Sequence, residues 1–288
     1  MDMFIQGIAN GILMGGVYAL IAIGLTMIFG VMNVVNFAQG EFLMLGMFAA
    51  YFLNRFIGLD PFLLLIIIIP LFFLVGAALE KALISRILQS DISQILFTLG
   101  LSVFLINLAL MIWGPNYKLV NAPYKFSMFR VGSVTLAVPR FLAFVAATCL
   151  IFILWIFVSR TDLGKALRAT SEKPEVVILM GINPDRMHLI AFGIGIALAA
   201  AAGTIITPFF YTFPSVGSFF VLTAFVVVVL GGMGNVLGAL IGALVIGVVE
   251  SLTAQYVGLD LGMLGAFVAF VLILLFKPRG IIGGGRLY

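Results

Sequence analysis

The chain has 288 residues, of which 64% are hydrophobic and only 9% are charged, and its mean hydropathy is +1.29. A soluble globular domain carries roughly 25% charged residues, so this composition excludes a soluble domain and predicts an integral membrane protein. The formal net charge of +4 does not indicate nucleic-acid binding, because Lys and Arg are scattered over segment ends instead of forming one basic face.

The apolar runs are long and lack strict alternation, which favours helices over a closed barrel. We therefore predict an all-α fold, a polytopic transmembrane bundle of about eight to ten helices, some of them interrupted, forming a single domain over 1–288. The candidate spans are 8–29, 37–53, 62–79, 92–112, 141–158, 189–206, 219–230, 236–252 and 261–276. Segment 219–230 is the weakest of these because it is short and can be a half-helix.

The orientation follows from the positions of Lys and Arg, which are enriched in cytoplasmic loops. The connection 159–187 is the densest in these residues, and 81–86 and the C-terminal tail fall on the same side if spans alternate. We therefore place the C-terminus in the cytoplasm and, with nine crossings, the N-terminus outside. The connection 113–140 also carries basic residues, yet alternation makes it external, and we interpret it as an ordered external loop.

A short polar segment, residues 36–41, separates two very hydrophobic runs. Polar groups at membrane depth lose water, so a role in transport is the default hypothesis for Asn36, Gln39 and Glu41. Asn36 and Gln39 are about one helical turn apart and can face one cavity, although capping of an interrupted helix explains them equally well. Glu41 lies on a different part of the helix surface, where its carboxylate can bond free amides at the helix start.

Small residues recur at four-residue spacing, which lets helix backbones approach closely. Gly234, Gly238 and Gly242 form one such ridge, and two further steps of four reach Ile246 and Glu250. Glu250 is therefore predicted to lie on a packed face. It can pair with a cation of a partner subunit, line an outer vestibule, or have a purely structural role.

The basic connection 159–187 is predicted to form two short helices. Thr161 or Asp162 can cap the first one, Pro174 can open the second at its first turn, and Gly181 suits the left-handed position that ends it. This segment is either a solvated basic loop or a docking element for a cytoplasmic partner. The chain has no Gly-x-x-x-x-Gly-Lys-Ser/Thr phosphate loop, so any ATP that drives it must bind another subunit.

Four stretches carry a family resemblance: GILMGGVYALIAIGLT at 11–26, NFAQGE at 36–41, GKALRAT at 164–170 continuing to MGI at 180–182, and GGMGN at 231–235 followed by Gly238 and Ala239. They closely resemble the branched-chain amino acid ABC transporter permeases, on the LivH side of the LivH/LivM pair. The match runs nearly end to end, with the motifs in the expected order.

This resemblance implies a permease subunit of the bacterial inner membrane that transports branched-chain or other hydrophobic amino acids and is not itself an enzyme. Family members also carry urea, short amides and aromatic acids. The implied partners are a second homologous permease, two cytoplasmic ATPase subunits that bind ATP and Mg²⁺, and a periplasmic solute-binding protein. No cofactor is expected in this chain.

The resemblance also implies that 162–183 contacts an ATPase. The residues expected to carry this coupling are Asp162, Gly164, Lys165, Arg168, Ala169, Glu172, Met180 and Gly181, and those expected along the substrate pathway are Asn36, Gln39, Glu41 and Glu250. The family usually has His where this chain has Gln39. Gln cannot titrate near neutral pH, which argues against a protonation-dependent role at that position.

The alternative function is a self-sufficient channel or an ion-coupled secondary carrier for small amides or urea, with Glu41 and Glu250 as its ionisable groups. We disfavour it because these two isolated acids and a single histidine, His188, make a poor proton relay.

Overall fold

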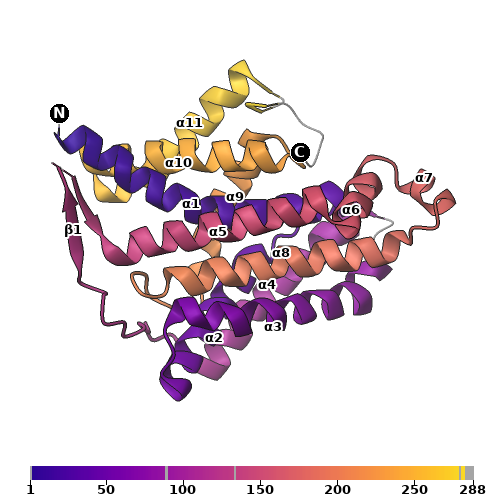
Figure 1. Cartoon of the computed structure of the whole chain (residues 1–288), viewed down its shortest axis with the longest axis horizontal. Helices are drawn as coiled ribbons and strands as arrows, with labels where there is room; N and C mark the ends of the chain where they lie inside the picture. Colours follow the sequence, from indigo (N-terminus) through magenta and orange to yellow (C-terminus); the bar gives the residue numbers. More distant parts are fainter. Residues whose placement is uncertain (1, 88–89, 133, 279, 283–288) are drawn as a thin grey trace.

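The computed structural model describes residues 2–87, 90–132, 134–278 and 280–282. It is a helical bundle with a small β-hairpin at one end, the hairpin end, and two short helices at the other, the α6–α7 end (Figure 1). The helices are α1 (Asp2–Met32), α2 (Gln39–Ile57), α3 (Pro61–Ala82), α4 (Asp91–Trp113), α5 (Val138–Arg160), α6 (Asp162–Glu172), α7 (Pro174–Leu179), α8 (Pro184–Ile206), α9 (Val216–Gly231), α10 (Val236–Tyr256) and α11 (Gly262–Phe276). The 3₁₀ turns are η1 (Ile84–Arg86) and η2 (Leu259–Leu261), and the strands are β1 (Met128–Val131) and β2 (Val134–Ala137).

The predicted all-α membrane fold is confirmed. Within the described residues, seven helices are long and apolar enough to cross a membrane: α1, α3, α4, α5, α8, α10 and α11. The two remaining predicted spans are also helices, α2 with 19 residues and α9 with only 16. The segment predicted to be the weakest span is thus a helix that falls short of the length needed to count as a candidate membrane span.

Helices α1 and α8 form the centre of the bundle. In each of them 83% of the most apolar window is buried inside the chain, against 17% for α4 and 11% for α11. Helix α1 packs against α5, α8, α9 and α10, while α2 and α3 pack against α8. The outer helices α4, α5 and α11 leave large apolar side chains exposed, which a bilayer or a partner subunit can cover.

Close packing of α1 against α10 depends on glycine. A Cβ atom added to Gly11 would lie 2.7 Å from the carbonyl oxygen of Gly247, and one added to Gly15 would lie 3.0 Å from that of Ala243. Gly11 and Gly15, four residues apart, therefore form a glycine ridge on α1 that serves as a helix-packing surface. On α10, Gly242 of the predicted ridge faces α9, whereas Gly247, which lies outside that ridge, faces α1.

The first helix continues past the predicted end at residue 29. It stops at Met32, and Asn33 then adopts a left-handed conformation with φ of 54° while its amide bonds to the carbonyl of Phe29 at 2.8 Å. Asn is one of the few non-Gly residues that tolerate this conformation at a helix C-terminus. The polar segment that follows is therefore a short link, and α2 starts at Gln39.

The connection 113–140 contains the hairpin, whose strands pair antiparallel with Met128 opposite Ala137 and Val131 opposite Val134. The sequence did not indicate these strands. Gln6 anchors the hairpin to α1, because its side-chain amide exchanges two hydrogen bonds with the backbone of Thr135, at 2.7 and 2.8 Å.

A second anchor holds the same connection to α3. The Tyr124 hydroxyl donates to Oδ2 of Asp60 at 2.6 Å, while Oδ1 of Asp60 caps α3 through the amide of Phe62. Burial and the Asp60 carboxylate raise the pKa of Tyr124 above its ordinary value, so the phenol stays a hydrogen-bond donor. The connection is thus tied to the bundle by side chains at both ends.

Candidate functional site

The polar segment forms a closed hydrogen-bond chain between α2 and α8. Asn36 accepts from the amide of Ala38 at 3.1 Å through Oδ1, and its Nδ2 donates to Oε1 of Gln39 at 3.1 Å. Gln39 in turn donates from Nε2 to the carbonyl of Gly195 at 3.0 Å. Both side chains are 0% exposed. Asn36 therefore caps the chain turn before α2, and Gln39 connects α2 to α8.

Two glycines make room for this contact. A Cβ atom on Gly24 of α1 would lie 2.8 Å from the carbonyl oxygen of Gly195 and 3.0 Å from Nε2 of Gln39. The backbones of α1 and α8 therefore approach closely, with the Gln39 amide filling the remaining space. Asn36 and Gln39 lie on one side, as the sequence predicted, and in this structure they bond each other and are fully buried.

Glu41 lies apart from this chain of hydrogen bonds. It is 1% exposed, and neither carboxylate oxygen has a hydrogen-bond partner within 3.5 Å in the described part of the protein. The hydroxyl of Ser102 on α4 is the polar group that faces it. The structure agrees with the sequence in separating Glu41 from Gln39, and it leaves the carboxylate as a buried polar group.

Glu250 lies in a different place, at the wall of a cavity of about 230 Å³. The Tyr18 hydroxyl donates to its Oε1 at 3.0 Å and joins α1 to α10. The lining residues are Asn10, Met14, Tyr18, Arg140, Phe209, Phe210, Gly247, Glu250 and Ser251. Of the four predicted pathway residues, the structure thus brings Asn36 and Gln39 together and separates Glu41 and Glu250 from them.

Sequence reasoning missed Tyr18 and Arg140. A signal for Tyr18 was present, because Asn10, Met14 and Tyr18 recur every four residues and so share one face of α1, beside the glycine ridge. Arg140 gave no local signal, since a basic residue in the first turn of a helix is usual at a membrane surface. Only the packing of α5 near α1 brings it to this cavity.

A further titratable residue that the sequence analysis did not single out, Glu80, lies on α3 near the α6–α7 end. Glu80 is 2% exposed and its Oε1 has no hydrogen-bond partner among the described residues. Its carboxylate is close enough to Asp185 of α8 for electrostatic repulsion, and Asp185 also acts on His188. His188 is half-buried and has Asp185 as its acidic neighbour.

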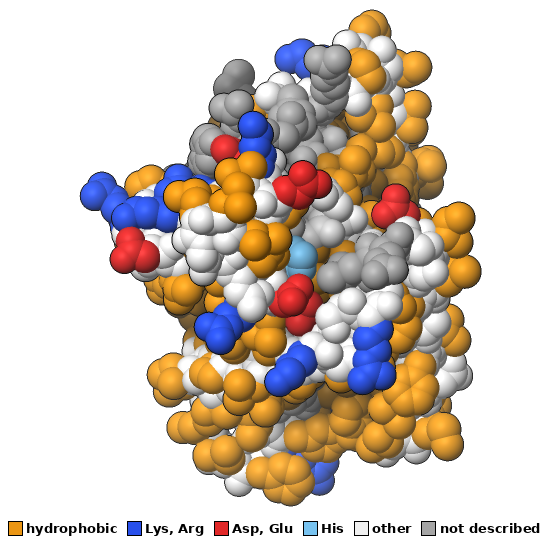
Figure 2. Space-filling model, turned by 90° about the vertical axis from the view of Figure 1, so that its right-hand side faces the viewer, with side chains coloured by type: hydrophobic (Ala, Val, Ile, Leu, Met, Phe, Trp, Pro, Cys, Tyr) orange, Lys and Arg blue, Asp and Glu red, His pale blue; other side chains and the backbone are white. Residues whose placement is uncertain are grey.

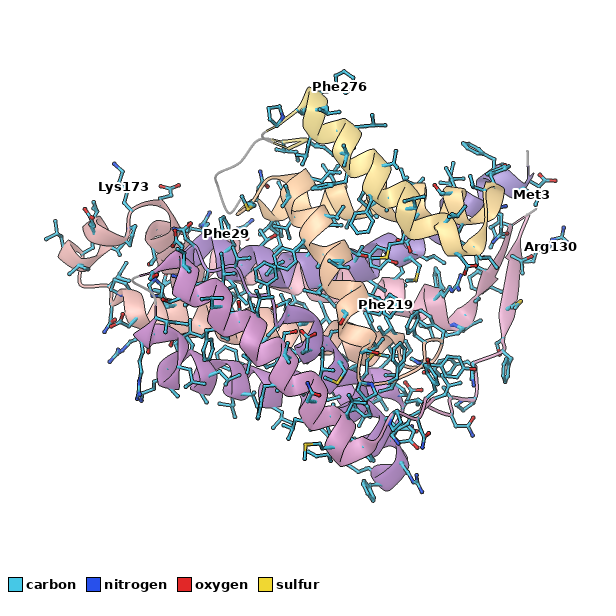
Figure 3. The ribbon with its side chains drawn as sticks, turned by 180° about the vertical axis from the view of Figure 1, so that it is seen from behind. Met3, Phe29, Arg130, Lys173, Phe219 and Phe276 are labelled. Atoms are coloured by element: carbon cyan, nitrogen blue, oxygen red, sulfur yellow. The ribbon has the colours of Figure 1, made fainter. Side chains whose placement is uncertain are left out.

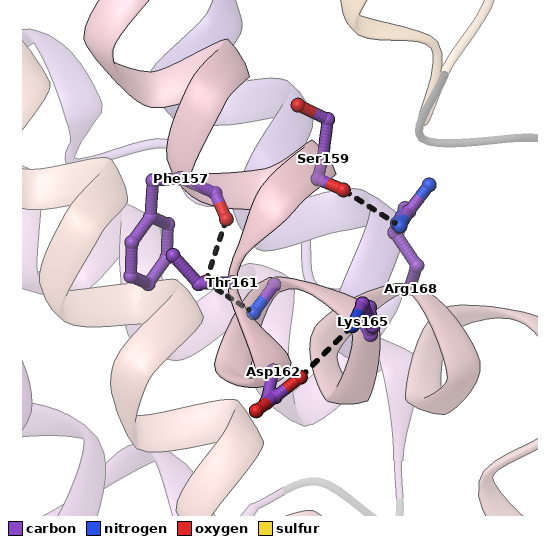
Figure 4. Close-up of polar contacts among 7 residues, drawn as sticks. Phe157, Ser159, Thr161, Asp162, Lys165 and Arg168 are labelled. Carbon is purple, nitrogen blue, oxygen red and sulfur yellow. Dashed lines mark hydrogen bonds and ion pairs between the residues drawn. The ribbon is translucent and has the colours of Figure 1, made fainter.

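Helix α6 is built as the sequence predicted, with Thr161 as the capping residue. Its hydroxyl accepts from the amide of Gly164 at 3.0 Å, and Asp162, the other candidate, is the first residue of the helix (Figure 4). Asp162 instead pairs with Lys165 at 2.9 Å. The Lys165 ammonium beside it holds the pKa of the Asp162 carboxyl below its ordinary value.

Helix α6 is fixed to the end of α5. A guanidinium nitrogen of Arg168 donates to the carbonyl of Ser159 at 3.5 Å. Gly164 is buried against the backbone of Val158, and a Cβ there would lie 2.6 Å from the Val158 Cα. These contacts attach α6 firmly to the end of α5, which is a membrane-crossing helix. Ala169 and Glu172 follow on the same helix, which ends where the amide of Lys173 bonds to the Ala169 carbonyl at 3.1 Å.

Helix α7 is also built as predicted: Pro174 is its first residue, and Gly181 follows with φ of +77°. Only Val177 of its apolar residues is buried, whereas Leu179 is 87% and Met180 is 72% exposed. Acidic and basic side chains gather on the same end of the molecule (Figure 2). This end therefore presents an apolar helix within a charged surface, with nothing from the described chain covering it.

Comparison with known proteins fixes the family. The model of the family described as branched-chain amino acid transport system / permease component matches residues 7–277. The chain belongs to this permease family. No solved structure matches it.

Individual members of the family agree with this assignment. BraD of Pseudomonas aeruginosa, a branched-chain amino acid permease protein, is 32% identical, over 97% of this chain and 96% of BraD. LivH of Escherichia coli K12 is 30% identical, over 97% of this chain and 96% of LivH. LivM of Salmonella typhimurium is 27% identical, over 92% of this chain and 68% of LivM. The chain is thus a multi-pass membrane permease subunit of an ABC importer of the LivH type.

Proposed function

We propose that this permease imports branched-chain or other hydrophobic amino acids across the bacterial inner membrane, driven by ATP hydrolysis in separate subunits. The relatives BraD and LivH are branched-chain amino acid permease proteins over almost their whole length. The proposal that ATP hydrolysis in a partner drives transport rests on the exposed apolar surface of α7. This helix follows α6, which is fixed to the end of α5 by the hydrogen bond of Arg168 to Ser159. An apolar helix in this setting fits a groove on a partner.

The α6–α7 end is proposed to be cytoplasmic, because Lys and Arg near membrane spans are enriched on that side. Lys173 lies at this end and Arg130 at the opposite, hairpin end (Figure 3). The basic residues toward the α6–α7 end are Lys81, Arg86, Arg160, Lys165, Arg168, Lys173, Arg186 and Lys277, and those toward the hairpin end are Arg55, Lys118, Lys125, Arg130 and Arg140. Arg279 and Arg286 of the tail lie outside the described residues.

The proposed partners follow from this orientation. One ATPase subunit binds α6 and α7, contacting Met180 and the residues of the expected coupling set. Similarity to LivM as well as LivH supports pairing with a second, homologous permease. A periplasmic solute-binding protein would dock at the hairpin end, where Tyr211 is exposed beside Tyr117 in an aromatic cluster.

Transport would require the contact between α2 and α8 to open. In this structure Gln39 and Gly195 join α2 to α8 by a buried hydrogen bond, which we propose is the closed position of the pathway. Movement of α6 with its ATPase would be transmitted to α5 through Arg168 and Gly164, and α5 packs directly on α1 and α8. Separation of α8 from α2 would then expose Asn36 and Gln39 to a passing solute.

The test uses two leucines that are equally exposed at opposite ends. We expect Leu179→Asp on α7 to abolish ATP-driven leucine uptake by the complete transporter, because a charge would enter the proposed apolar interface. Leu259→Asp is the control, since Leu259 is also 87% exposed but lies in η2. Membrane levels of both variants are measured by immunoblot. Normal uptake by Leu179→Asp at normal abundance would refute the docking role of α7.

A further inference from the structure

The cavity at Glu250 combines opposite charges with an apolar wall. Glu250 of α10 and Arg140 at the start of α5 both line it, together with Met14, Phe209 and Phe210. Its volume of about 230 Å³ is below the roughly 300–1,000 Å³ of pockets that hold drug-sized ligands. The cavity therefore suits a small solute that carries both charges and an apolar group.

Within the described residues, Arg140 and Glu250 do not form an ion pair with each other. Their charged atoms are therefore more than 4.0 Å apart. Arg140 also makes no hydrogen bond to any described residue. Ionisable groups inside membrane proteins are costly and usually pair with one another or mark a substrate path. Glu250 is half-buried without a counter-charge, whereas Arg140 is exposed at the start of α5, where solvent reaches its side chain.

The Glu250 carboxylate is fixed with one oxygen occupied. Tyr18 donates to Oε1 at 3.0 Å, whereas Oε2 is buried without a hydrogen-bond partner in the described structure. Because Oε2 is closed off from solvent, a ligand donor would meet the carboxylate on the side that lines the cavity. Tyr18 thus acts as a positioning residue that orients the acid.

The geometry points to a binding site for the zwitterion of an α-amino acid with an apolar side chain. Its ammonium group pairs with the Glu250 carboxylate, its carboxylate accepts from the Arg140 guanidinium, and its side chain lies against Met14, Phe209 and Phe210. This site deepens the proposed function and rests on it for the identity of the solute. Binding is non-covalent, and no proton is transferred between the ligand and the protein.

The site has a defined place along the chain. Asn10 and Met14 are in the half of α1 nearer the hairpin and Tyr18 is at its middle, whereas the contact of Gln39 with Gly195 lies beside Gly24. Tyr18 and Gly24 are separated by about 9 Å along the helix axis, at 1.5 Å per residue. A solute arriving from the hairpin end would therefore meet this site before it reaches the closed contact.

The test measures binding to the complete permease–ATPase complex in nanodiscs, without the solute-binding protein. Saturation-transfer NMR is suitable because a pathway site must bind weakly enough to release its solute. The probes are leucine, 4-methylpentanoate, which lacks the ammonium group, and leucinamide, which lacks the carboxylate. We expect leucine to bind about 10- to 100-fold more tightly than either analogue, the range for charge-assisted hydrogen bonds.

Two variants must change this preference in opposite ways. In Glu250→Gln, which keeps an acceptor for Tyr18, leucine loses its advantage over 4-methylpentanoate but keeps its advantage over leucinamide. In Arg140→Gln the reverse holds, and Arg140→Lys restores part of the preference. Arg130→Gln in the hairpin is the control and leaves all three affinities unchanged.

The outcomes separate this site from the proposed function. A wild-type complex that binds 4-methylpentanoate and leucinamide as tightly as leucine overturns the site, and so do variants that weaken all three probes equally, because a structural role would do that. ATP-driven leucine uptake is measured in parallel with the binding protein added. Uptake without the charge-dependent pattern refutes the site alone, whereas absence of uptake refutes the proposed function.

Discussion

Gln39 on α2 donates a hydrogen bond of 3.0 Å to the backbone carbonyl of Gly195 on α8, at a point where both residues are buried. The bond joins two helices across the centre of the bundle, and its donor is held by a second bond from Asn36 at 3.1 Å. An amide contact of this kind can break and reform without moving a proton. This suits a gate that opens by helix movement instead of by titration.

Replacing Gln39 by Leu should destabilise this closed arrangement. The change leaves the Nδ2 group of Asn36 buried without its acceptor, which costs about 1–3 kcal/mol. We expect a lower midpoint of thermal unfolding in detergent and reduced uptake. Gln255→Leu is the matched control, because Gln255 donates to the carbonyl of Met3 at the surface. Equal midpoints for the two variants would show that the buried contact contributes little.

Gly46 should be intolerant of a single added methyl group. A Cβ there would lie 2.6 Å from the Cα of Ala200, so α2 would be pushed away from α8. Gly46→Ala should cost about 1–3 kcal/mol, the usual range for overpacking. Gly100→Ala on α4 is the control: a Cβ meets nothing within 4 Å, and the change should be neutral or stabilising. Unfolding midpoints of both variants measure the difference.

Gly181 should be required for coupling and not for folding of the bundle. Its φ of +77° costs a side-chain-bearing residue roughly 1–2 kcal/mol, so Gly181→Val should disturb the end of α7. Uptake should be lost while ATP hydrolysis becomes uncoupled from the solute. Arg168→Ala should act in the same way by freeing α6 from Ser159.

Gly58 provides the matched control for Gly181. It also ends a helix with a nearly identical φ of +76° and open space around it, but it follows α2 at the other end of the molecule. Gly58→Val should therefore carry the same strain and retain coupled uptake. Loss of uptake in both variants to the same extent would assign the defect to backbone strain alone.

The Asp162–Lys165 pair should make α6 insensitive to pH near neutrality. Because the pKa of Asp162 is lowered by Lys165, its contribution is complete above the unfolded value of about 4 and is lost only as pH falls through the lowered value. Lys165→Gln should raise the titration midpoint of the Asp162 carboxyl. Carboxyl-carbon NMR of the labelled protein measures it, and an unchanged midpoint would contradict the pairing.

Local chemistry was enough to predict the α6–α7 segment. Thr before a helix, Pro in its first turn and Gly after its last turn each start or end the helix through contacts with residues close in sequence. The structure shows all three at Thr161, Pro174 and Gly181. The separation of Glu41 from Gln39 was equally predictable, because it follows from helix periodicity alone.

Contacts between distant helices could not be predicted in this way. The cavity at Glu250 needs α1, α5 and α10 to meet, and neither Tyr18 nor Arg140 has a distinctive neighbour in sequence. Likewise, the sequence could not decide whether Asn36 and Gln39 face a cavity or cap an interrupted helix, because it could not show how closely Gly24 and Gly195 bring α1 and α8 together. The burial of a polar residue depends on which helix faces it.

The most direct measurement of the central claim is solute flux in proteoliposomes. Radiolabelled leucine uptake is compared for this chain alone and for the complex of both permeases, both ATPases and the solute-binding protein, each with ATP and with a non-hydrolysable analogue. We predict accumulation only for the complete complex with ATP. Leucine flux through the chain alone, or accumulation that does not depend on ATP hydrolysis, would contradict the account and favour a self-sufficient channel or carrier.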